Sequence, residues 1–178
     1  MQLPVFELPE EPVEIEKTLE VNWLDNFLGG KHQTACGASS PQIFHGRIQR
    51  VGMDVIVQAD FLMQLDAECS RCLKSFRLDL PINFRVTLRP RPQHQDPLPI
   101  EQELTSEDID QDFYDNELID LGSIVREQIL LALPMVPRCS EECRGLCATC
   151  GQDLNQGECS CDRTDIDPRW GAIKTLVH

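Results

Sequence analysis

The sequence predicts an α+β fold: an antiparallel β meander with one face covered by a helix, followed by a small cysteine-rich, zinc-binding C-terminal segment. Three observations predict this architecture. Two long stretches in the middle of the 178-residue chain alternate apolar and polar side chains, which is the period of a strand with one buried face. A later stretch repeats apolar residues every three or four positions, as an amphipathic helix does. Eight of the nine cysteines fall into two groups, a pattern typical of metal ligands.

Residues 1–40 form a poorly specified N-terminal segment. The apolar residues between Leu19 and Leu28 suit either a strand or a short amphipathic segment docked on the core, and Gly29-Gly30 then leads into a loop. The start of the chain has neither the positive charge nor the apolar stretch of a secretory signal. The sequence also contains no apolar run near the roughly 20 residues of a membrane helix. We therefore expect a cytoplasmic protein with no membrane partner.

The middle of the chain predicts three antiparallel strands. The two long strands span about 54–67 and 75–89, and a shorter strand at about 43–50 joins them through a turn near Gly52. Pro81 interrupts the third strand. Because proline has no N–H to donate to the ladder, Pro81 predicts either an edge position or a β-bulge.

The meander and a helix together make up the expected main domain, residues 41–137. Within this domain, the proline-rich and acidic stretch 93–117 predicts a solvated linker. Asp120 is the predicted N-cap of a helix over 121–132. Pro134 ends that helix, since the residue before a proline avoids the helical region. The apolar stripe of the helix is expected to cover the apolar face of the sheet.

Charge is segregated along the chain. Overall, 16 Lys and Arg face 30 Asp and Glu, and the net charge of −14 argues against a general polyanion binder. Residues 44–91 nevertheless hold eight basic side chains against five acidic ones, so this stretch is +3 and the remainder is −17. Residues 95–125 contain ten acids and no Lys or Arg. Any contact with an anionic partner is therefore expected on the meander.

The cysteines are the strongest chemical signal in the sequence. Cys69 and Cys72 lie at the predicted tip between the two long strands, in a Cys-x-x-Cys pattern. The other group lies in the expected zinc-binding tail, residues 138–178. It consists of Cys139, Cys143, Cys147, Cys150, Cys159 and Cys161. Two cysteines separated by two residues can reach one ion from a tight turn.

The residue after each Cys-x-x-Cys pair helps to set the shape of its turn. Gly151 follows Cys150 and can adopt the positive φ that closes a zinc knuckle. Leu73 takes the matching position at the hairpin tip. The hairpin turn must therefore either differ from a knuckle or be strained.

The sequence leaves several ligand sets open. Four thiolates are needed for an all-cysteine zinc site, and such a site is structural because it has no open position for water. One solution is a local site of four cysteines from the tail; the other joins the hairpin pair to a pair from the tail, and eight cysteines can also hold two ions. An iron–sulfur cluster and unliganded reduced thiols remain alternatives. The local site would use Cys147, Cys150, Cys159 and Cys161; the joint site would use Cys69, Cys72, Cys147 and Cys150.

Catalytic signatures are missing from the sequence. It contains no P-loop, dinucleotide-binding glycine motif, GxSxG or HExxH pattern. The four histidines are scattered, and Cys36 stands apart from the other cysteines in an expected loop. The sequence therefore gives no reason to expect an enzyme or a small-molecule substrate.

Several motifs follow one another in a distinctive order. They are Cys69-Ser-Arg-Cys72, Ala132-Leu133-Pro134-Met135-Val136-Pro137, Cys143-Arg-Gly-Leu-Cys147-Ala-Thr-Cys150-Gly151, Asp153-Leu154-Asn155 and Asp167-Pro168-Arg169-Trp170-Gly171-Ala172-Ile173-Lys174. With these motifs the chain resembles a bacterial and plastid family, the YceD family of large ribosomal RNA subunit accumulation proteins, over roughly residues 40–178. The resemblance implies a role in the synthesis, processing or stability of large-subunit ribosomal RNA, without an established catalytic activity.

Three functional hypotheses follow. The first is a ribosome-biogenesis factor that binds ribosomal RNA, because arginines on a sheet can contact phosphates and unpaired bases. The second is a redox-sensitive zinc protein or chaperone, because thiolates release zinc on oxidation. The third is a zinc-stabilised adaptor for a protein partner, which merges with the first if that partner is a ribosomal protein of the large subunit. The candidate RNA-binding residues are Arg71, Lys74, Arg77, Arg85 and Arg89.

Overall fold

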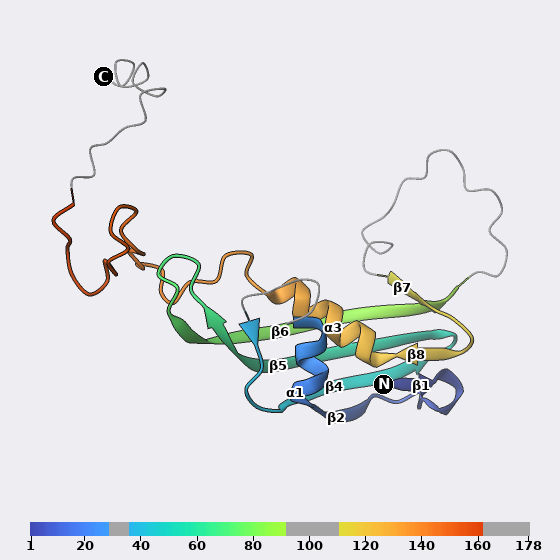
Figure 1. Ribbon diagram of the computed structural model, residues 1–178. Helices are drawn as coiled ribbons and strands as arrows, with labels where there is room; N and C mark the ends of the chain where they lie inside the picture. The colour runs from blue at the N-terminus through green and yellow to red at the C-terminus, as the bar shows by residue number, and fades with distance from the viewer. Residues whose placement is uncertain (29–35, 92–110, 162–178) are drawn as a thin grey trace, which may run out of the picture.

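The computed structural model describes residues 1–28, 36–91 and 111–161. A six-stranded sheet forms one layer, and two helices lie across one of its faces (Figure 1). The strands follow the order β2-β4-β5-β6-β7, with β3 also pairing with β5. The fold is therefore α+β, as the sequence predicts. The strands of this sheet are β2 (Val13–Leu19), β3 (Cys36–Gly37), β4 (Gln42–Val51), β5 (Asp54–Glu68), β6 (Ser75–Pro90) and β7 (Gln111–Tyr114).

The predicted meander is confirmed as β4, β5 and β6. Gly52, with a φ of 65°, forms the turn between β4 and β5. Along β5 the buried side chains alternate with exposed ones, so that one face of the sheet lines the core. Pro81 pairs with Leu62 in an uninterrupted register. On its other side, β7 reaches only the stretch Thr87–Pro90. Among the described residues, Pro81 therefore lies at an open edge, which is one of the two placements that the sequence predicts.

The helix α3 (Leu121–Ala132) has the predicted bounds and the predicted cap. The Asp120 carboxylate accepts a hydrogen bond of 3.0 Å from the backbone N–H of Gly122. The helix ends at Ala132 because Leu133, which precedes Pro134, is extended. Buried residues of α3, including Val125 and Ile129, pack into the same core as the sheet.

The N-terminal segment contributes more structure than its composition indicates. β1 (Gln2–Pro4) pairs with β8 (Leu118–Asp120), and a short 3-10 helix, η1 (Val5–Glu7), follows β1. β2 then adds an edge strand beside β4. The apolar group expected to be a strand or an amphipathic segment is the helix α1 (Val21–Leu28). Within the described residues, two helices therefore cover the sheet, where the sequence predicts one.

The end of the acidic stretch is the main departure from the expected architecture. Part of the linker predicted at 93–117 forms β7, which is parallel to β6 and makes the sheet mixed. Tyr114 explains this pairing: its ring is buried, and its hydroxyl donates a hydrogen bond of 2.8 Å to the carbonyl of Met53. The acidic composition of this stretch predicts a linker and gives no sign of the buried contact made by Tyr114. The rest of the predicted linker, residues 92–110, lies outside the described residues.

Helix length and polarity bear on membrane insertion. In the parts of the chain that the structure describes, no helix is both long and apolar enough to cross a membrane.

Candidate metal centre

The two Cys-x-x-Cys turns have the same backbone shape. At the β5–β6 tip, the N–H of Leu73 donates to the carbonyl of Cys69 at 2.9 Å. In the tail, the N–H of Gly151 donates to the carbonyl of Cys147, also at 2.9 Å. The following residues both have positive φ, 58° for Leu73 and 75° for Gly151. The hairpin turn is therefore a knuckle that accepts a strained leucine, which is one of the two predicted outcomes.

After α3 the chain returns to the hairpin tip and is held there by its backbone. The N–H of Ser70 donates to the carbonyl of Pro137 at 2.9 Å, and the N–H of Leu146 donates to the carbonyl of Arg71 at 3.1 Å. The Arg71 guanidinium also donates to the carbonyl of Cys143 at 2.8 Å. These contacts bring the first two tail cysteines beside the hairpin pair.

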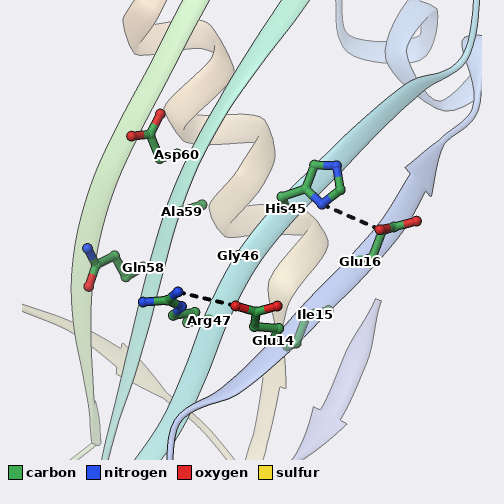
Figure 2. Close-up of a pocket in the computed structure, with 9 residues that line it drawn as sticks. All are labelled: Glu14, Ile15, Glu16, His45, Gly46, Arg47, Gln58, Ala59 and Asp60. Atoms are coloured by element: carbon green, nitrogen blue, oxygen red, sulfur yellow. Dashed lines mark hydrogen bonds and ion pairs between the residues drawn. The ribbon is translucent and has the colours of Figure 1, made fainter.

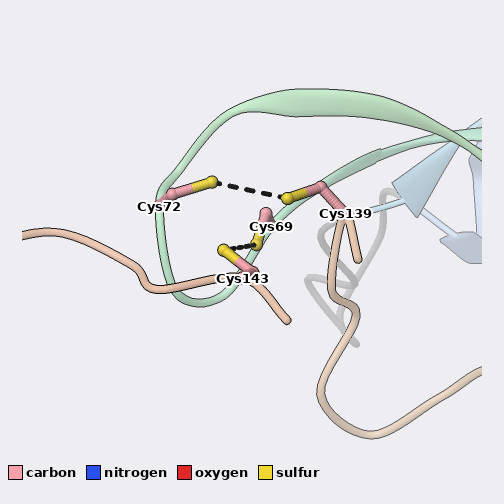
Figure 3. A group of neighbouring side chains, drawn as sticks. All are labelled: Cys69, Cys72, Cys139 and Cys143. Atoms are coloured by element: carbon pink, nitrogen blue, oxygen red, sulfur yellow. Dashed lines mark hydrogen bonds between the residues drawn. The ribbon is translucent and has the colours of Figure 1, made fainter. Parts of the chain in front are cut away.

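The hairpin site consists of Cys69, Cys72, Cys139 and Cys143, whose sulfurs all lie within 4.8 Å of one another (Figure 3). The Sγ atoms of Cys69 and Cys143 are 3.8 Å apart, and those of Cys72 and Cys139 are 3.7 Å apart. A tetrahedral ion with Zn–S bonds of about 2.3 Å separates its sulfurs by about 3.8 Å. The hairpin site therefore has the dimensions of a four-thiolate metal site.

The tail site consists of Cys147, Cys150, Cys159 and Cys161, and its four sulfurs also lie within 4.8 Å of one another. Cys147 is buried, Cys150 is exposed, and Cys159 and Cys161 are half-buried. The N–H of Cys147 donates to the carbonyl of Gln152 at 2.8 Å, which closes the knuckle. This grouping is the local alternative that the sequence leaves open.

The second alternative, in which the hairpin pair shares an ion with Cys147 and Cys150, does not agree with the structure. The structure places Cys139 and Cys143 beside Cys69 and Cys72 instead. Sequence reasoning missed this pairing because Cys139 and Cys143 are spaced by four positions and lie far along the chain from the hairpin. A usable signal was present, since a local four-cysteine tail site leaves these two cysteines without a role.

In each site, the surroundings shift the pKa values of two thiols in opposite directions. Burial raises the pKa of Cys69, but backbone N–H groups from Cys139, Cys72 and Arg71 outweigh it, and the pKa falls to about 6. Burial, with the neighbouring thiols, raises the pKa of Cys139 to about 12. One thiol in the hairpin site therefore ionises readily while another resists ionisation, because burial and the neighbouring thiols both oppose its negative charge.

The tail site has the same division between two of its thiols. Backbone N–H groups of Cys150 and Thr149 lower the pKa of Cys147 to about 6. The hydrogen bond with the Cys150 thiol, followed by burial, raises the pKa of Cys161 to about 12. A bound dication would remove this opposition in both sites, since metal ligation deprotonates thiols.

The five candidate RNA-binding residues are all exposed. Arg71 and Lys74 lie at the hairpin tip, next to the hairpin site. Arg77, Arg85 and Arg89 lie on the face of β6 that points away from the helices, as the alternation predicts. Acidic side chains share this face. In the sheet register Asp66 is opposite Arg77, and Asp54 pairs with Arg89 at 3.3 Å.

A hollow of about 520 Å³ lies over β2, β4 and β5 on the same helix-free face (Figure 2). Four of its side chains form two pairs: Arg47 contacts Glu14 at 3.2 Å, and His45 contacts Glu16 at 3.5 Å. The Asp60 carboxylate accepts a hydrogen bond from Asn83. The hollow lies away from both cysteine sites. Its internal ion pairs make it a poor match for a dedicated anion or cation site.

Comparison with known proteins assigns the family. A family model described as "Large ribosomal RNA subunit accumulation protein YceD" matches residues 57–177, a range that contains both cysteine sites. The chain belongs to the YceD family. A YceD homologue from Arabidopsis thaliana, described as chloroplastic, is 31% identical over 58 residues, which is 33% of this chain and 18% of that protein. No solved structure matches the sequence.

Two bacterial relatives match larger shares of this chain. An uncharacterized protein of Mycobacterium tuberculosis is 32% identical over 131 residues, which is 74% of this chain and 59% of the relative. The matched part therefore spans about three-fifths of the length of this mycobacterial relative. The uncharacterized protein YlbN of Bacillus subtilis is 26% identical over 180 residues, covering 97% of this chain and 92% of that protein.

Proposed function

We propose that this protein is a non-enzymatic ribosome-biogenesis factor. It supports the synthesis, processing or stability of large-subunit ribosomal RNA by binding RNA or a ribosomal protein in the bacterial cytoplasm. The observation that carries this proposal is the YceD family match over residues 57–177. The name of that family ties it to the accumulation of large-subunit ribosomal RNA.

Zinc is the proposed metal in both cysteine sites. Each site offers four sulfurs within 4.8 Å of one another, and four thiolates in tetrahedral geometry are a common ligand set for structural zinc. A cluster of several irons spreads its cysteine ligands over more than one metal atom, so the tight sulfur spacing favours a single ion. In the hairpin site, zinc would hold the start of the tail against the β5–β6 tip, and in the tail site it would fold residues 147–161.

The proposed contact surface runs from the metal-stapled tip along β6. It comprises Arg71 and Lys74 at the tip and Arg77, Arg85 and Arg89 on the strand. The hairpin site lies at the turn that carries the two tip cations. Attachment of the tail there would keep this turn rigid for contact with a partner. The acids on the same face moderate its attraction for RNA, so we expect weak, strongly salt-dependent RNA binding or the binding of a ribosomal protein.

Genetic replacement tests the function. In bacterial cells lacking the gene, we expect the ratio of large-subunit to small-subunit ribosomal RNA to fall, and wild-type protein to restore it. A double variant, Cys69→Ser/Cys143→Ser, should restore it poorly, because the tail is no longer fixed to the hairpin. Cys36→Ser is the matched control, since Cys36 lies in the main core, outside both cysteine sites. An unchanged ratio in the deletion strain would refute the proposed function.

Crosslinking in cells tests the contact surface. The triple variant Arg77→Glu/Arg85→Glu/Arg89→Glu should lose crosslinks to ribosomal RNA or to a ribosomal protein, and a complex that survives nuclease treatment identifies the protein partner. Arg126→Glu is the matched control, because Arg126 is an exposed arginine on α3. Wild-type crosslinking by the triple variant would remove the β6 face from the proposal.

A further inference from the structure

The two cysteine sites differ in how far solvent reaches them. In the hairpin site, Cys69 and Cys143 are almost completely buried, with 0% and 1% of their surface exposed, Cys72 is also buried, and Cys139 is half-buried. In the tail site, Cys150 is exposed, and Cys159 and Cys161 are half-buried. Reagents in solution therefore meet the tail sulfurs first.

The two sites also differ in the structure that supports them. The hairpin site lies at the turn between the long strands β5 and β6, and Phe76 and Leu146 pack against its cysteines. The structure describes all of residues 147–161, and apart from Cys147 the buried apolar residue in this stretch is Leu154. A segment with so little apolar burial depends on its metal for a defined fold.

A short segment connects the two sites and couples them. Asn155, from the tail loop, donates from Nδ2 to the Sγ of Cys143 at 3.5 Å, and its Oδ1 accepts from the N–H of Arg144 at 2.8 Å. The N–H of Leu154 donates to the carbonyl of Gly145 at 2.9 Å. A folded tail loop therefore supplies a hydrogen bond to a hairpin-site sulfur, whereas the hairpin site needs no tail-site sulfur to be complete.

We propose that the hairpin site is a permanent zinc site and that the tail site is an exchangeable one, which peroxide oxidises with release of its zinc. The inference rests on the proposed metal centre and assigns it a regulation. Loss of the tail ion unfolds residues 147–161, while the hairpin site keeps residues 139–143 attached to the sheet. Oxidation thereby alters the surface beside Arg71 without dismantling the fold.

The oxidation step uses hydrogen peroxide as the oxidant. The exposed Cys150 thiolate attacks one peroxide oxygen, the O–O bond breaks, and a sulfenic acid forms as the departing hydroxide takes a proton to become water. A second thiolate of the same site, all of whose sulfurs lie within 4.8 Å, attacks that sulfur. The S–S bond forms, and the released hydroxide takes a proton. Two thiolates, one peroxide and two protons thus give one disulfide and two waters, and the ion loses two ligands.

Zinc release from the zinc-loaded full-length protein tests the proposal. A chromophoric chelator reports release during exposure to hydrogen peroxide, while alkylation and mass spectrometry identify the oxidised cysteines. We expect two phases, with one ion leaving at least about tenfold faster than the other and with disulfides confined to the tail site. A single phase, or oxidation of the hairpin site first, would overturn the inference while leaving the metal centre intact.

Two variants keep the result interpretable. Cys159→Ser/Cys161→Ser removes the tail site and should leave one ion, which is released in the slow phase only. Cys36→Ser changes a cysteine outside both sites and should keep both phases at wild-type rates. Fast release of the remaining ion from the first variant would contradict the inference. A wild-type protein that binds no zinc would instead overturn the metal centre, and this inference with it.

Discussion

The backbone of Gly145 lies so close to the backbone of Arg71 that a side chain on Gly145 would push Arg71 aside. A Cβ atom on Gly145 would be 3.0 Å from the Arg71 carbonyl oxygen and 3.3 Å from the Arg71 Cβ. Gly145 also has a φ of 75°, which disfavours other residues. Arg71 lies between the two hairpin cysteines, and Gly145 lies between Cys143 and Cys147. This contact therefore joins the two candidate metal sites.

Replacement of Gly145 by alanine tests that contact. Gly145→Ala should destabilise the attachment of the tail by about 1–3 kcal/mol, because it combines a backbone clash with an unfavourable φ. Zinc affinity, measured by competition with a chelator, should fall. Gly157→Ala is the control, since a Cβ there meets no atom within 4 Å. Equal affinities for the two variants would show that the close approach is unimportant.

The matched knuckles give a second prediction. Gly151→Ala should weaken the tail site by about 1 kcal/mol, because a Cβ meets open space there and the positive φ is the sole penalty. Leu73→Gly should leave zinc binding at the hairpin site unchanged or strengthen it, because glycine relieves the same strain. Chelator competition on both variants measures these effects. A large loss of hairpin-site affinity in Leu73→Gly would mean that the leucine side chain, although exposed, supports the site.

Zinc binding should weaken as the pH falls. At pH 7 Cys139 and Cys161, with pKa values of about 12, are protonated before metal arrives. Each site must therefore release at least one proton on binding, and its affinity should drop about tenfold for each pH unit per proton released. Below about pH 6 the drop should steepen, since Cys69 and Cys147, with pKa values of about 6, then bind protons as well. Titrations at several pH values check this, and a pH-independent affinity would contradict thiolate ligation.

The core makes a separate prediction at Gly46. The ring of Phe44 lies over Gly46, and a Cβ there would be 2.6 Å from Cζ of that ring. Gly46→Ala should lower the free energy of unfolding by about 1–3 kcal/mol, because Phe44 is fully buried and has little room to move. Gly37→Ala is the control, since the nearest atom to its Cβ is a carboxylate oxygen at 3.8 Å. Denaturant unfolding compares the two variants, and similar stabilities would show that the ring can shift.

The meander and the capped helix could be predicted because their signals are local. Alternation along β5 and β6 and the Asp120 cap each involve neighbouring residues, and the structure confirms them. β7 could not be predicted in the same way. Tyr114 lies in a stretch whose charge resembles a linker, and its contact with Met53 joins residues 61 positions apart.

The same contrast between local and long-range signals applies to the two cysteine sites. The tail grouping was among the predicted solutions, since Cys147 through Cys161 are close in sequence. The hairpin grouping was missed because Cys69 and Cys143 lie 74 positions apart and meet only once α3 has brought the chain back along the sheet. The exposure difference between the sites likewise depends on the fold and not on the spacing of the cysteines.

X-ray absorption at the zinc edge tests the central claim most directly, which is that two sulfur-only zinc sites organise the tail and that one of them fixes it to the β5–β6 hairpin. The reduced, full-length protein should contain two zinc ions per chain, one for each group of four cysteines. Each ion should show four sulfur neighbours at about 2.3 Å. Zinc well below this stoichiometry, or a shell dominated by nitrogen or oxygen, would contradict the account.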